Sequence, residues 1–405
     1  MPRNSRPEPR SVLVAAISGR QLAASARRAG LTPLVADFFA DTDTQELAHA
    51  CRKLAGNIAH GIKWRTLAPA LDALADAAPS PVIGLIYGSG FEDRPELLTL
   101  MARRWTVLGN DAAIVARIKA PQSFFAALDR LDIKHPSTVV ERPARSAGWL
   151  AKRIGGAGGS HVVPNQRKSR GRNVYYQERA AGRTVSALFV ANEDEACVLG
   201  FSEQWTAPSP RSLWRYGGAV RPALLPASLA RTMASAVKRV AQEFELKGLC
   251  SADFIVSGDD AFLLEINPRP GATLDIFDSG RSPLLRMHLD SLLEGKLPRE
   301  ALKFSDAKAS AIVYAKDGIA VPPRMTWPDW VADRPKPSEW IDKNRPICTV
   351  SARAGTKGRA KRLVEERIVK VLSGFRNVSR GEEGEQKRRN RRSAPNGVAE
   401  RQRQS

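Results

Sequence analysis

The sequence predicts two kinds of fold in succession, a doubly wound α/β domain and then an α+β domain. At the start of the chain, short apolar runs alternate with helical patterns: strands at residues 11–17, 32–36 and 81–87, and helices at 21–29 and 96–104. Such alternation is typical of a parallel sheet with helices on both faces. From about residue 136 the chain changes to short strands and hairpin-like segments, which indicates α+β structure.

Periodicity predicts the remaining elements. The clearest is an amphipathic helix over residues 228–246, with Leu229, Met233, Val237, Val240 and Phe244 on one face. The others are a strand at 105–108, a helix at 119–130, strands at 149–152, 173–177, 185–190, 196–201, 309–314 and 347–350, and a helix at 358–372. We therefore divide the chain into an N-terminal domain (1–115), a central domain (116–300), a small C-terminal unit (301–375) and a disordered basic tail (376–405).

Composition excludes several classes of protein. No segment approaches the roughly 20 apolar residues of a membrane-spanning helix, and the apolar run at 12–17 is too short and too early for a signal peptide. We therefore expect a cytoplasmic protein. The cysteines are scattered, so we expect reduced thiols and neither a zinc site nor a disulfide framework; they are Cys51, Cys197, Cys250 and Cys348.

The charge indicates an anionic partner. The net charge is +21, which suits nucleic acid, an acidic lipid surface, or a nucleotide together with a carboxylate-rich substrate. Part of this charge lies in the basic run at 387–392. Such runs are usually solvated, so this run is weak evidence for RNA binding. Gly88 and Gly90 follow a predicted strand where open α/β sheets bind ligands, but the segment lacks the dinucleotide fingerprint, so a nicotinamide site is disfavoured.

The most informative segment is a predicted hairpin at residues 249–267. Alternation along its strands places Asp253 on one strand and puts Glu265 and Asn267 on a common face of the other. Two carboxylates and an amide oxygen are hard ligands that suit magnesium. A stiff Pro-Arg-Pro-Gly follows, which holds Arg269 beside the candidate metal, where it can neutralise a phosphate or an acyl phosphate. The alternative for such a face is a solvated hairpin.

This segment resembles the ATP-grasp superfamily, whose magnesium-binding strand carries a Glu-x-Asn-x-Arg pattern after an acidic residue on the partner strand. The resemblance implies a pre-ATP-grasp domain followed by an ATP-grasp fold, with ATP and Mg²⁺, or alternatively Mn²⁺, as cofactors. Asp253, Glu265 and Asn267 then match the metal ligands, and Arg269 matches the catalytic residue that stabilises the acyl phosphate.

The resemblance also assigns the ATP-binding residues, in chain order. Lys119 and Lys152 match the two phosphate-binding lysines, and a flexible glycine loop follows the second; the loop residues are Gly156, Gly158 and Gly159. Gln177, Glu178 and Ala180 match the hinge that meets the adenine. Thr184 stands where many members carry a ribose-binding glutamate, which leaves that contact in doubt.

The resemblance implies a carboxylate–amine ligase that acts through an acyl phosphate. The hinge is similar to that of a branch containing tyramine–glutamate ligases, so an amino-acid ligase of cofactor biosynthesis is expected. The alternatives are a bicarbonate-activating carboxylase or carbamoyl-phosphate-type enzyme, and a nucleic-acid-binding protein that uses the tail. The expected partners are small-molecule substrates, and membrane binding is not expected. The sequence leaves open whether the protein is a homodimer. Arg215 and Arg221 are candidates for holding a substrate carboxylate, beside a substrate loop at 205–218.

Overall fold

The N-terminal domain is a doubly wound α/β layer. The structure, a computed structural model, describes residues 10–165 and 173–392, with side chains up to Phe375. A parallel sheet in the order β3-β2-β1-β4 forms the centre of the domain. Its strands are β1 (Arg10–Ala15), β2 (Leu31–Asp37), β3 (Ala50–Lys53) and β4 (Val82–Tyr87), and its helices are α1 (Arg20–Arg28), α2 (Thr42–Leu47), α3 (Trp64–Asp76) and α4 (Glu96–Ala102).

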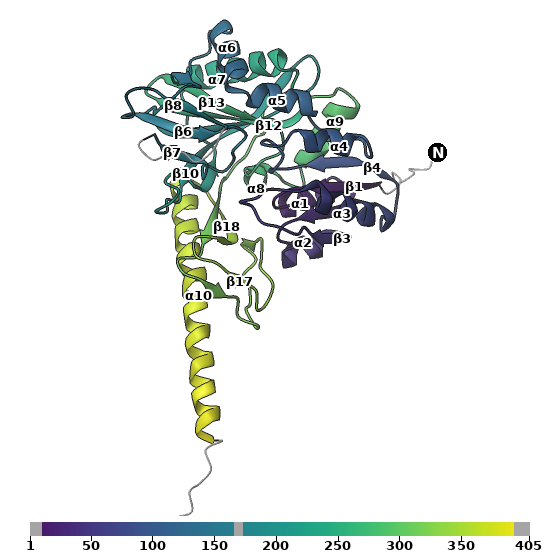
Figure 1. Ribbon diagram of the computed structural model, residues 1–405, viewed down its shortest axis with the longest axis vertical. Helices are drawn as coiled ribbons and strands as arrows, with labels where there is room; N and C mark the ends of the chain where they lie inside the picture. Colours follow the sequence, from purple (N-terminus) through teal and green to yellow (C-terminus); the bar gives the residue numbers. More distant parts are fainter. Residues whose placement is uncertain (1–9, 166–172, 393–405) are drawn as a thin grey trace, which may run out of the picture.

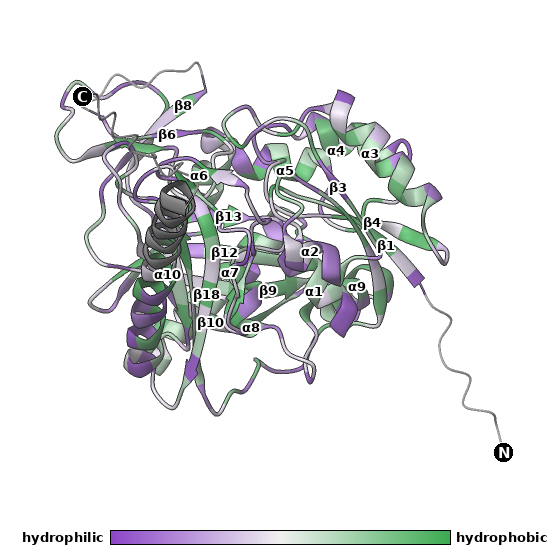
Figure 2. Ribbon diagram, turned by 90° about the horizontal axis from the view of Figure 1, so that it is seen from below, coloured by the Kyte–Doolittle hydropathy of each residue, from purple (hydrophilic) through white to green (hydrophobic). Residues whose placement is uncertain are grey.

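Both faces of this sheet are buried, because β1 is apolar from Val12 to Ala15. Val12 and Val14 point into one hydrophobic cluster, whereas Leu13 and Ala15 point into another on the opposite face. Figure 2 shows the apolar colouring of β1 and β4 in the interior of the domain. The fold class expected from the sequence is confirmed here.

One expected strand is reduced in the structure, and one expected helix has an additional helix before it. The expected strand at 105–108 is reduced to a single bridge between Leu85 and Val107. The expected helix at 119–130 is α6 (Pro121–Arg130), and a further helix that was not expected, α5 (Ala112–Lys119), precedes it. Pro121 separates the two helices, because a proline disfavours helical backbone at the preceding residue, and Ala120 is extended at ψ 116°. Asp111 caps α5 by accepting a hydrogen bond from the N–H of Ile114 at 2.8 Å.

The central domain is an antiparallel sheet covered on both faces. Its strand order is β13-β12-β9-β10-β11-β14-β18-β16, and the strands from this domain are β9 (Arg183–Ala191), β10 (Ala196–Thr206), β11 (Tyr216–Arg221), β12 (Gly248–Ser257) and β13 (Asp260–Asn267). Helix α7 (Ala227–Glu243) covers one face through Met233 and Val237. On the other face, Leu188 and Leu249 share a cluster with Val12 of the N-terminal domain. The two domains therefore have a common core.

A smaller antiparallel sheet lies beside the central one. Its order is β5-β8-β6-β7, formed by β5 (Thr138–Val139), β6 (Trp149–Arg153), β7 (Val162–Pro164) and β8 (Val174–Glu178). The candidate site lies between the two sheets, because β6 and β8 carry Lys152 and Gln177 whereas β12 and β13 carry Asp253 and Glu265. Helices α8 (Leu274–Phe277) and α9 (Leu284–Leu293) follow β13.

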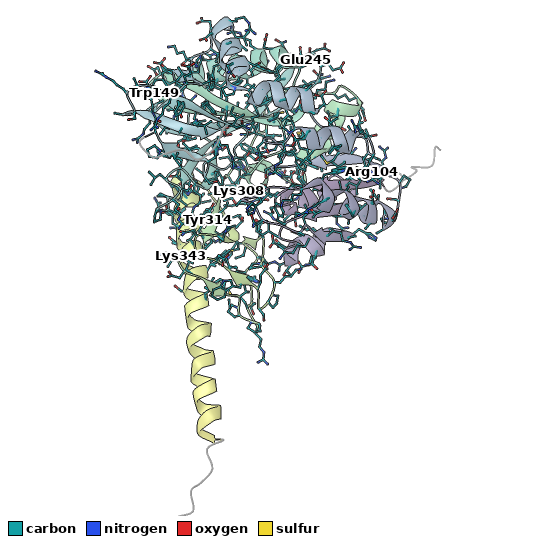
Figure 3. The ribbon with its side chains drawn as sticks, in the orientation of Figure 1. Arg104, Trp149, Glu245, Lys308, Tyr314 and Lys343 are labelled. Carbon is teal, nitrogen blue, oxygen red and sulfur yellow. The ribbon has the colours of Figure 1, made fainter. Side chains whose placement is uncertain are left out.

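The C-terminal unit continues the central sheet. β14 (Ala307–Tyr314) pairs with β11, and β18 (Pro346–Ala354) pairs with β14 and with the short β16 (Val331–Ala332). β15 (Ile319–Ala320) and β17 (Trp340–Ile341) form a separate two-stranded ladder. Lys308, at the start of β14, lies near the middle of the molecule in Figure 3 and donates a hydrogen bond to the carbonyl oxygen of Asp275.

The last helix extends beyond the expected boundary. Helix α10 runs from Lys357 to Arg392, past the boundary expected at residue 375; residues 393–405 of the expected tail lie outside the described residues. Val364, Val371 and Phe375 are buried against β14 and β18. Packing fixes the first turns, and adding further turns costs less than nucleating a helix. The rest of α10 projects away from the body (Figure 1).

No helix within the described ranges is both long enough and apolar enough to cross a membrane.

Candidate active site

The β12–β13 hairpin brings the predicted metal ligands together. Asp253 and Glu265 are directly opposite in the ladder, and Asn267 lies two residues along β13 on the same face. The amide of Asn267 donates to Asp253 Oδ2 at 3.1 Å, and Gln204 on β10 donates to Asp253 Oδ1 at 3.3 Å. The expected geometry of the hairpin is therefore present, and Gln204 is an additional residue that the sequence did not single out.

The electrostatics of the pair fit a bound cation. Burial and the neighbouring Glu265 raise the pKa of Asp253 to about 6. Burial opposes ionisation of Glu265 too, but the ammonium groups of Lys119 and Lys152 contribute to a lowered pKa. Two carboxylates this close favour a cation between them. The described residues contain no group of three or more His, Cys, Asp or Glu that could hold a metal alone, so a magnesium ion here would complete its shell with phosphate oxygens and water.

Two lysines approach the carboxylates from other elements. Lys119, at the end of α5, lies with its Nζ 3.3 Å from Asn267 Oδ1 and 3.6 Å from Glu265 Oε2. Lys152, on β6, is buried, and the burial lowers its pKa. Both ammonium groups therefore face the site where phosphates would meet the metal.

Gln177 orients Lys152. Its Oε1 accepts a hydrogen bond from Lys152 Nζ at 2.6 Å, and its Nε2 donates to Thr138 Oγ1 at 3.1 Å. Gln177 is thus occupied inside the sheet, whereas Glu178, the next residue on β8, is exposed. The backbone N–H of Ala180 has no backbone hydrogen bond within the described part of the chain, which leaves it available for an adenine edge.

The glycine loop is held between two other loops. Gly155, Gly158 and Gly159 all have φ near +68°, a conformation that favours glycine. A Cβ on Gly159 would lie 1.9 Å from the carbonyl oxygen of Trp214, and one on Gly155 would lie 2.4 Å from the carbonyl oxygen of Glu92. These approaches explain why glycine is needed. A Cβ on Gly156 would likewise meet the ring of His161 at 2.2 Å.

A small cavity lies under this loop. It has a volume of about 20 Å³ and combines polar with apolar walls; the lining includes Lys119, Glu265, Gly156, His161, Phe125, Tyr175 and Leu264. Aromatic and aliphatic walls beside Lys119 suit a nucleotide base. The space is that of a single water, so nucleotide entry requires the glycine loop to move. The sequence did not single out His161, Phe125, Tyr175 or Leu264, because their positions depend on contacts between sheets.

Arg269 forms a buried ion pair that joins the two domains. Its Nε donates to Glu92 Oε1 at 2.7 Å, and both residues are under 10% exposed. Burial opposes ionisation of Glu92, but the charges of Arg269 and Lys119 and the N–H of Gly90 lower its pKa to about 2. Glu92 lies in the loop after β4, at the edge where open α/β sheets bind ligands. This position in the chain is the feature from which Glu92 could have been predicted as a site residue.

The remaining candidates are placed differently from the expectation. Arg215 stacks on Tyr314, 3.5 Å from the ring centroid, and donates to the carbonyl oxygens of Ala207 and Asn344. Arg221 is buried and donates to Ile276 and Asp306. Both arginines are thus held by the protein itself, which argues against their holding a substrate carboxylate. The expected loop at 205–218 is shorter, because β10 continues to Thr206 and β11 begins at Tyr216. Thr184 lies on β9 opposite Gln204.

Comparison with known proteins finds a family model that matches the central part of the chain. Residues 122–273 match the family model described as the ATP-grasp domain. An uncharacterised protein of Methanocaldococcus jannaschii is 27% identical over 190 residues, which are 47% of this chain and 45% of that relative. The chain thus matches less than half the length of this relative.

Two solved structures share the fold. An L-amino acid ligase from Bacillus licheniformis has a TM-score of 0.65 at 10% identity, covering 88% of this chain and 96% of its own. The biotin carboxylase domain of a Hydrogenobacter thermophilus 2-oxoglutarate carboxylase, solved with MgADP and bicarbonate, has a TM-score of 0.64 at 12% identity, covering 85% and 86%. Residues 122–273 of the chain thus match the ATP-grasp domain, and the chain shares the fold of these two solved structures.

Proposed function

We propose that this protein is an ATP-dependent ligase that converts a carboxylate into an acyl phosphate and couples the acyl group to an amine. The observation that carries the proposal is the convergence of Asp253, Glu265 and Asn267 with Lys119, and of Lys152 beside them, at one site between two sheets. The match of residues 122–273 to the ATP-grasp domain supports the dependence on ATP and magnesium. The solved amino-acid ligase of the same fold supports an amino acid as one substrate.

The site residues have distinct tasks in this reaction. Asp253, Glu265 and Asn267 would hold Mg²⁺, which supplies charge neutralisation to the phosphates when it is bound. Lys119 and Lys152 bind the phosphate oxygens and offset the negative charge that moves during transfer. The glycine loop closes over the phosphates with its N–H groups, and Ala180 receives the adenine edge.

Arg269 then acts on the acyl group. The carboxylate oxygen of the substrate attacks the γ-phosphorus, the bond to the β–γ bridging oxygen breaks, and ADP leaves. The amine attacks the acyl carbon, loses a proton and expels inorganic phosphate. The Arg269 guanidinium, fixed by Glu92, stabilises the negative charge of both the acyl phosphate and the tetrahedral intermediate. We further propose that the product is an amide of the kind that tyramine–glutamate ligases form.

A second candidate function is activation of bicarbonate. The solved biotin carboxylase domain of the same fold binds bicarbonate, and bicarbonate is a carboxylate that forms an acyl phosphate by the same attack. The two functions differ in what stimulates ADP release. Bicarbonate alone, with no other carboxylate, would suffice for the second, whereas the ligase needs an organic carboxylate and an amine together.

The test is magnesium-dependent ADP release by the purified protein, with pools of amino acids and amines. We expect release only when both pools are present, and at least a hundredfold less in Glu265→Gln and Asn267→Ala. Asp259→Asn, at the exposed turn of the same hairpin, is the matched control and should retain the wild-type rate. Release that is unchanged in Glu265→Gln would contradict the assignment of the site.

A further inference from the structure

A buried asparagine connects the N-terminal domain to the segment that carries Arg269. Asn110 lies immediately before Asp111, the cap of α5, and its residue is only 1% exposed. The side-chain amide of asparagine has two donor hydrogens and an acceptor oxygen, and burial of such a group is costly unless it is hydrogen-bonded. The hydrogen bonds of Asn110 therefore indicate what this residue holds in place.

Asn110 binds two backbone segments at once. Its Oδ1 accepts a hydrogen bond from the N–H of Lys247 at 2.8 Å, and its Nδ2 donates to the carbonyl oxygen of the same residue at 2.9 Å. Its Nδ2 also donates to the carbonyl oxygen of Pro268 at 2.9 Å. Lys247 precedes β12 and Pro268 follows β13. The amide of Asn110 thus fixes the turn before β12 relative to the residue after β13.

Tyr87 supports the same carbonyl group. Its side chain, at the end of β4, is 2% exposed. The hydroxyl donates to the carbonyl oxygen of Asn110 at 2.7 Å and lies 3.3 Å from the carbonyl oxygen of Pro268. The Pro268 carbonyl is therefore approached by two donors from the N-terminal side of the chain. A buried polar network that is fully satisfied favours a single geometry, so the backbone at Pro268 is held in one position.

Arg269 lies beyond the part of the hairpin that the sheet positions. The last pair of the β12–β13 ladder is Ser251 with Asn267, so the ladder fixes Asn267 but not the two residues that follow it. There the backbone forms a three-residue turn, in which the N–H of Arg269 donates to the carbonyl oxygen of Asn267 at 2.9 Å. Pro268 is the central residue of this turn. The hydrogen bond from Asn110 to Pro268 therefore supports the backbone that carries Arg269.

A second buried side chain joins the same parts of the chain without binding this turn. His288 on α9 is also 1% exposed. Its Nδ1 accepts a hydrogen bond from the N–H of Leu249 at 2.8 Å, and its Nε2 donates to the carbonyl oxygen of Leu108 at 3.0 Å. Both His288 and Asn110 therefore link the segment before α5 to the start of β12, but of the two only Asn110 binds Pro268. This contrast distinguishes a contact that stabilises the junction from one that also positions Arg269.

We propose that Asn110 is a positioning residue for the ligation and that it acts through Arg269. The N-terminal side of the chain then holds Arg269 in two ways, at its backbone through Asn110 and at its guanidinium through Glu92. A displacement of about 1 Å in a reacting group can slow a reaction roughly a hundredfold, so the fixed backbone matters for catalysis as well as for stability. This inference rests on the proposed ligase function for its purpose, but one of its tests requires no turnover.

The kinetic test measures hydroxamate formation from ATP, Mg²⁺, hydroxylamine and the amino acid that best supports ADP release. Asn110→Asp has the same shape but places an oxygen opposite the carbonyl oxygens of Lys247 and Pro268, so the turn must move. We expect kcat to fall about a hundredfold. KM for ATP and the half-saturating Mg²⁺ concentration should change less than about twofold, because Lys152 and Asn267 are positioned by their own strands.

The loss of kcat should depend on the presence of Arg269. In Arg269→Lys, which keeps a cation beside Glu92, the further change Asn110→Asp should lower kcat by less than about threefold, because residues that act through one another are not additive. His288→Leu is the matched control. It leaves buried backbone groups of the same junction without partners, so it should lower the melting temperature but keep the wild-type kcat below that temperature. Asn110→Ser removes the donor to Pro268 without adding a charge, and it should show the same selective loss of kcat if Asn110→Asp fails to fold.

The test without turnover observes the Arg269 side chain by ¹⁵N NMR. The Nε–H resonance of Arg269, assigned by its loss in Arg269→Lys, should shift in Asn110→Asp and in Asn110→Ser but not in His288→Leu. The proposal is overturned if this resonance does not shift in the Asn110 variants, if Asn110→Asp lowers kcat equally in the Arg269→Lys background, or if His288→Leu lowers kcat as much. Failure of the ligase function is separate. It appears as no hydroxamate from the wild type with any carboxylate, and the resonance alone then decides the proposal.

Discussion

At the scale of single residues, two buried carboxylates have opposite environments. Glu92 is compensated by Arg269 at 2.7 Å, and its pKa is lowered to about 2. Asp41 has no such compensation, and its pKa is raised to about 9. The first stabilises the contact between domains in its ionised form, whereas the second destabilises the fold once it ionises. Substitution of the two residues by their amides should therefore have opposite effects on stability.

Glu92→Gln should destabilise the protein strongly. The substitution leaves the Arg269 guanidinium buried without its counter-charge, and breaking a buried ion pair in this way costs about 3 to 5 kcal/mol. Thermal unfolding at pH 7 measures it. The double variant Glu92→Gln, Arg269→Met should recover part of the loss; a single variant as stable as the wild type would contradict the buried pair.

Asp41→Asn should stabilise the protein, and more so at higher pH. The ordinary pKa of an aspartate in the unfolded chain is about 3.9, so between pH 4 and 9 the folded state retains the proton more tightly than the unfolded state. Stability of the wild type therefore falls as pH rises through this window. The variant lacks this contribution. Its melting temperature should exceed that of the wild type by a margin that grows from pH 5 to pH 8; a constant margin would contradict the raised pKa.

At the scale of elements, the glycine loop is shaped by contact as well as by conformation. Gly158 and Gly159 share a positive φ, +67° and +69°, but only Gly159 faces a backbone oxygen at 1.9 Å from an added Cβ. Gly158 has nothing within 4 Å. Substitutions at the two residues therefore distinguish the effect of backbone strain from the effect of a steric clash.

Gly159→Ala should weaken ATP binding much more than Gly158→Ala. Both variants carry the strain of alanine at positive φ, about 1 kcal/mol, but only Gly159→Ala displaces the loop from Trp214. We expect KM for ATP to rise roughly tenfold further in Gly159→Ala, a difference worth about 1.4 kcal/mol. Equal effects would show that the loop does not need its contact with Trp214.

The elements show what the sequence could and could not predict. The hairpin geometry of Asp253, Glu265 and Asn267 followed from alternation alone, because a strand fixes the direction of its side chains. The helix expected from residue 119 begins at Pro121, because a proline suits the first turn of a helix and disfavours helical backbone before it. No element was predicted between residues 37 and 80, where α3 contains Pro69. Partners distant in sequence, such as Glu92 with Arg269, required the fold.

At the scale of the whole molecule, one core joins the N-terminal and central domains, and one sheet joins the central domain to the C-terminal unit. The domain boundaries expected from composition therefore do not mark separate cores. The ATP-grasp domain match and the fold were predictable because several motifs occur in a fixed order along the chain. The substrate was not predictable, because the loops that would recognise it vary independently of the fold.

Truncation after Phe375 should separate catalysis from the basic tail. Phe375 is the last buried contact of α10 within the described side chains, so the shortened protein should keep its melting temperature and its ADP release. Salt-dependent binding of a polynucleotide, measured by anisotropy, should be lost if the wild type shows it. A truncation at residue 370, which removes Val371 and Phe375, is the contrasting variant and should unfold at a lower temperature. Loss of ADP release after truncation at Phe375 would show that catalysis depends on the basic tail, and would contradict this prediction.

The central claim is that Asp253, Glu265 and Asn267 support formation of an acyl phosphate. The most direct measurement is trapping with hydroxylamine, which converts an acyl phosphate into a hydroxamate without the natural amine. With ATP, Mg²⁺ and a panel of amino acids, the account predicts hydroxamate and ADP in equal amounts from the wild type and neither from Glu265→Gln. Formation of AMP and pyrophosphate instead, or a hydroxamate yield that survives Glu265→Gln, would contradict it.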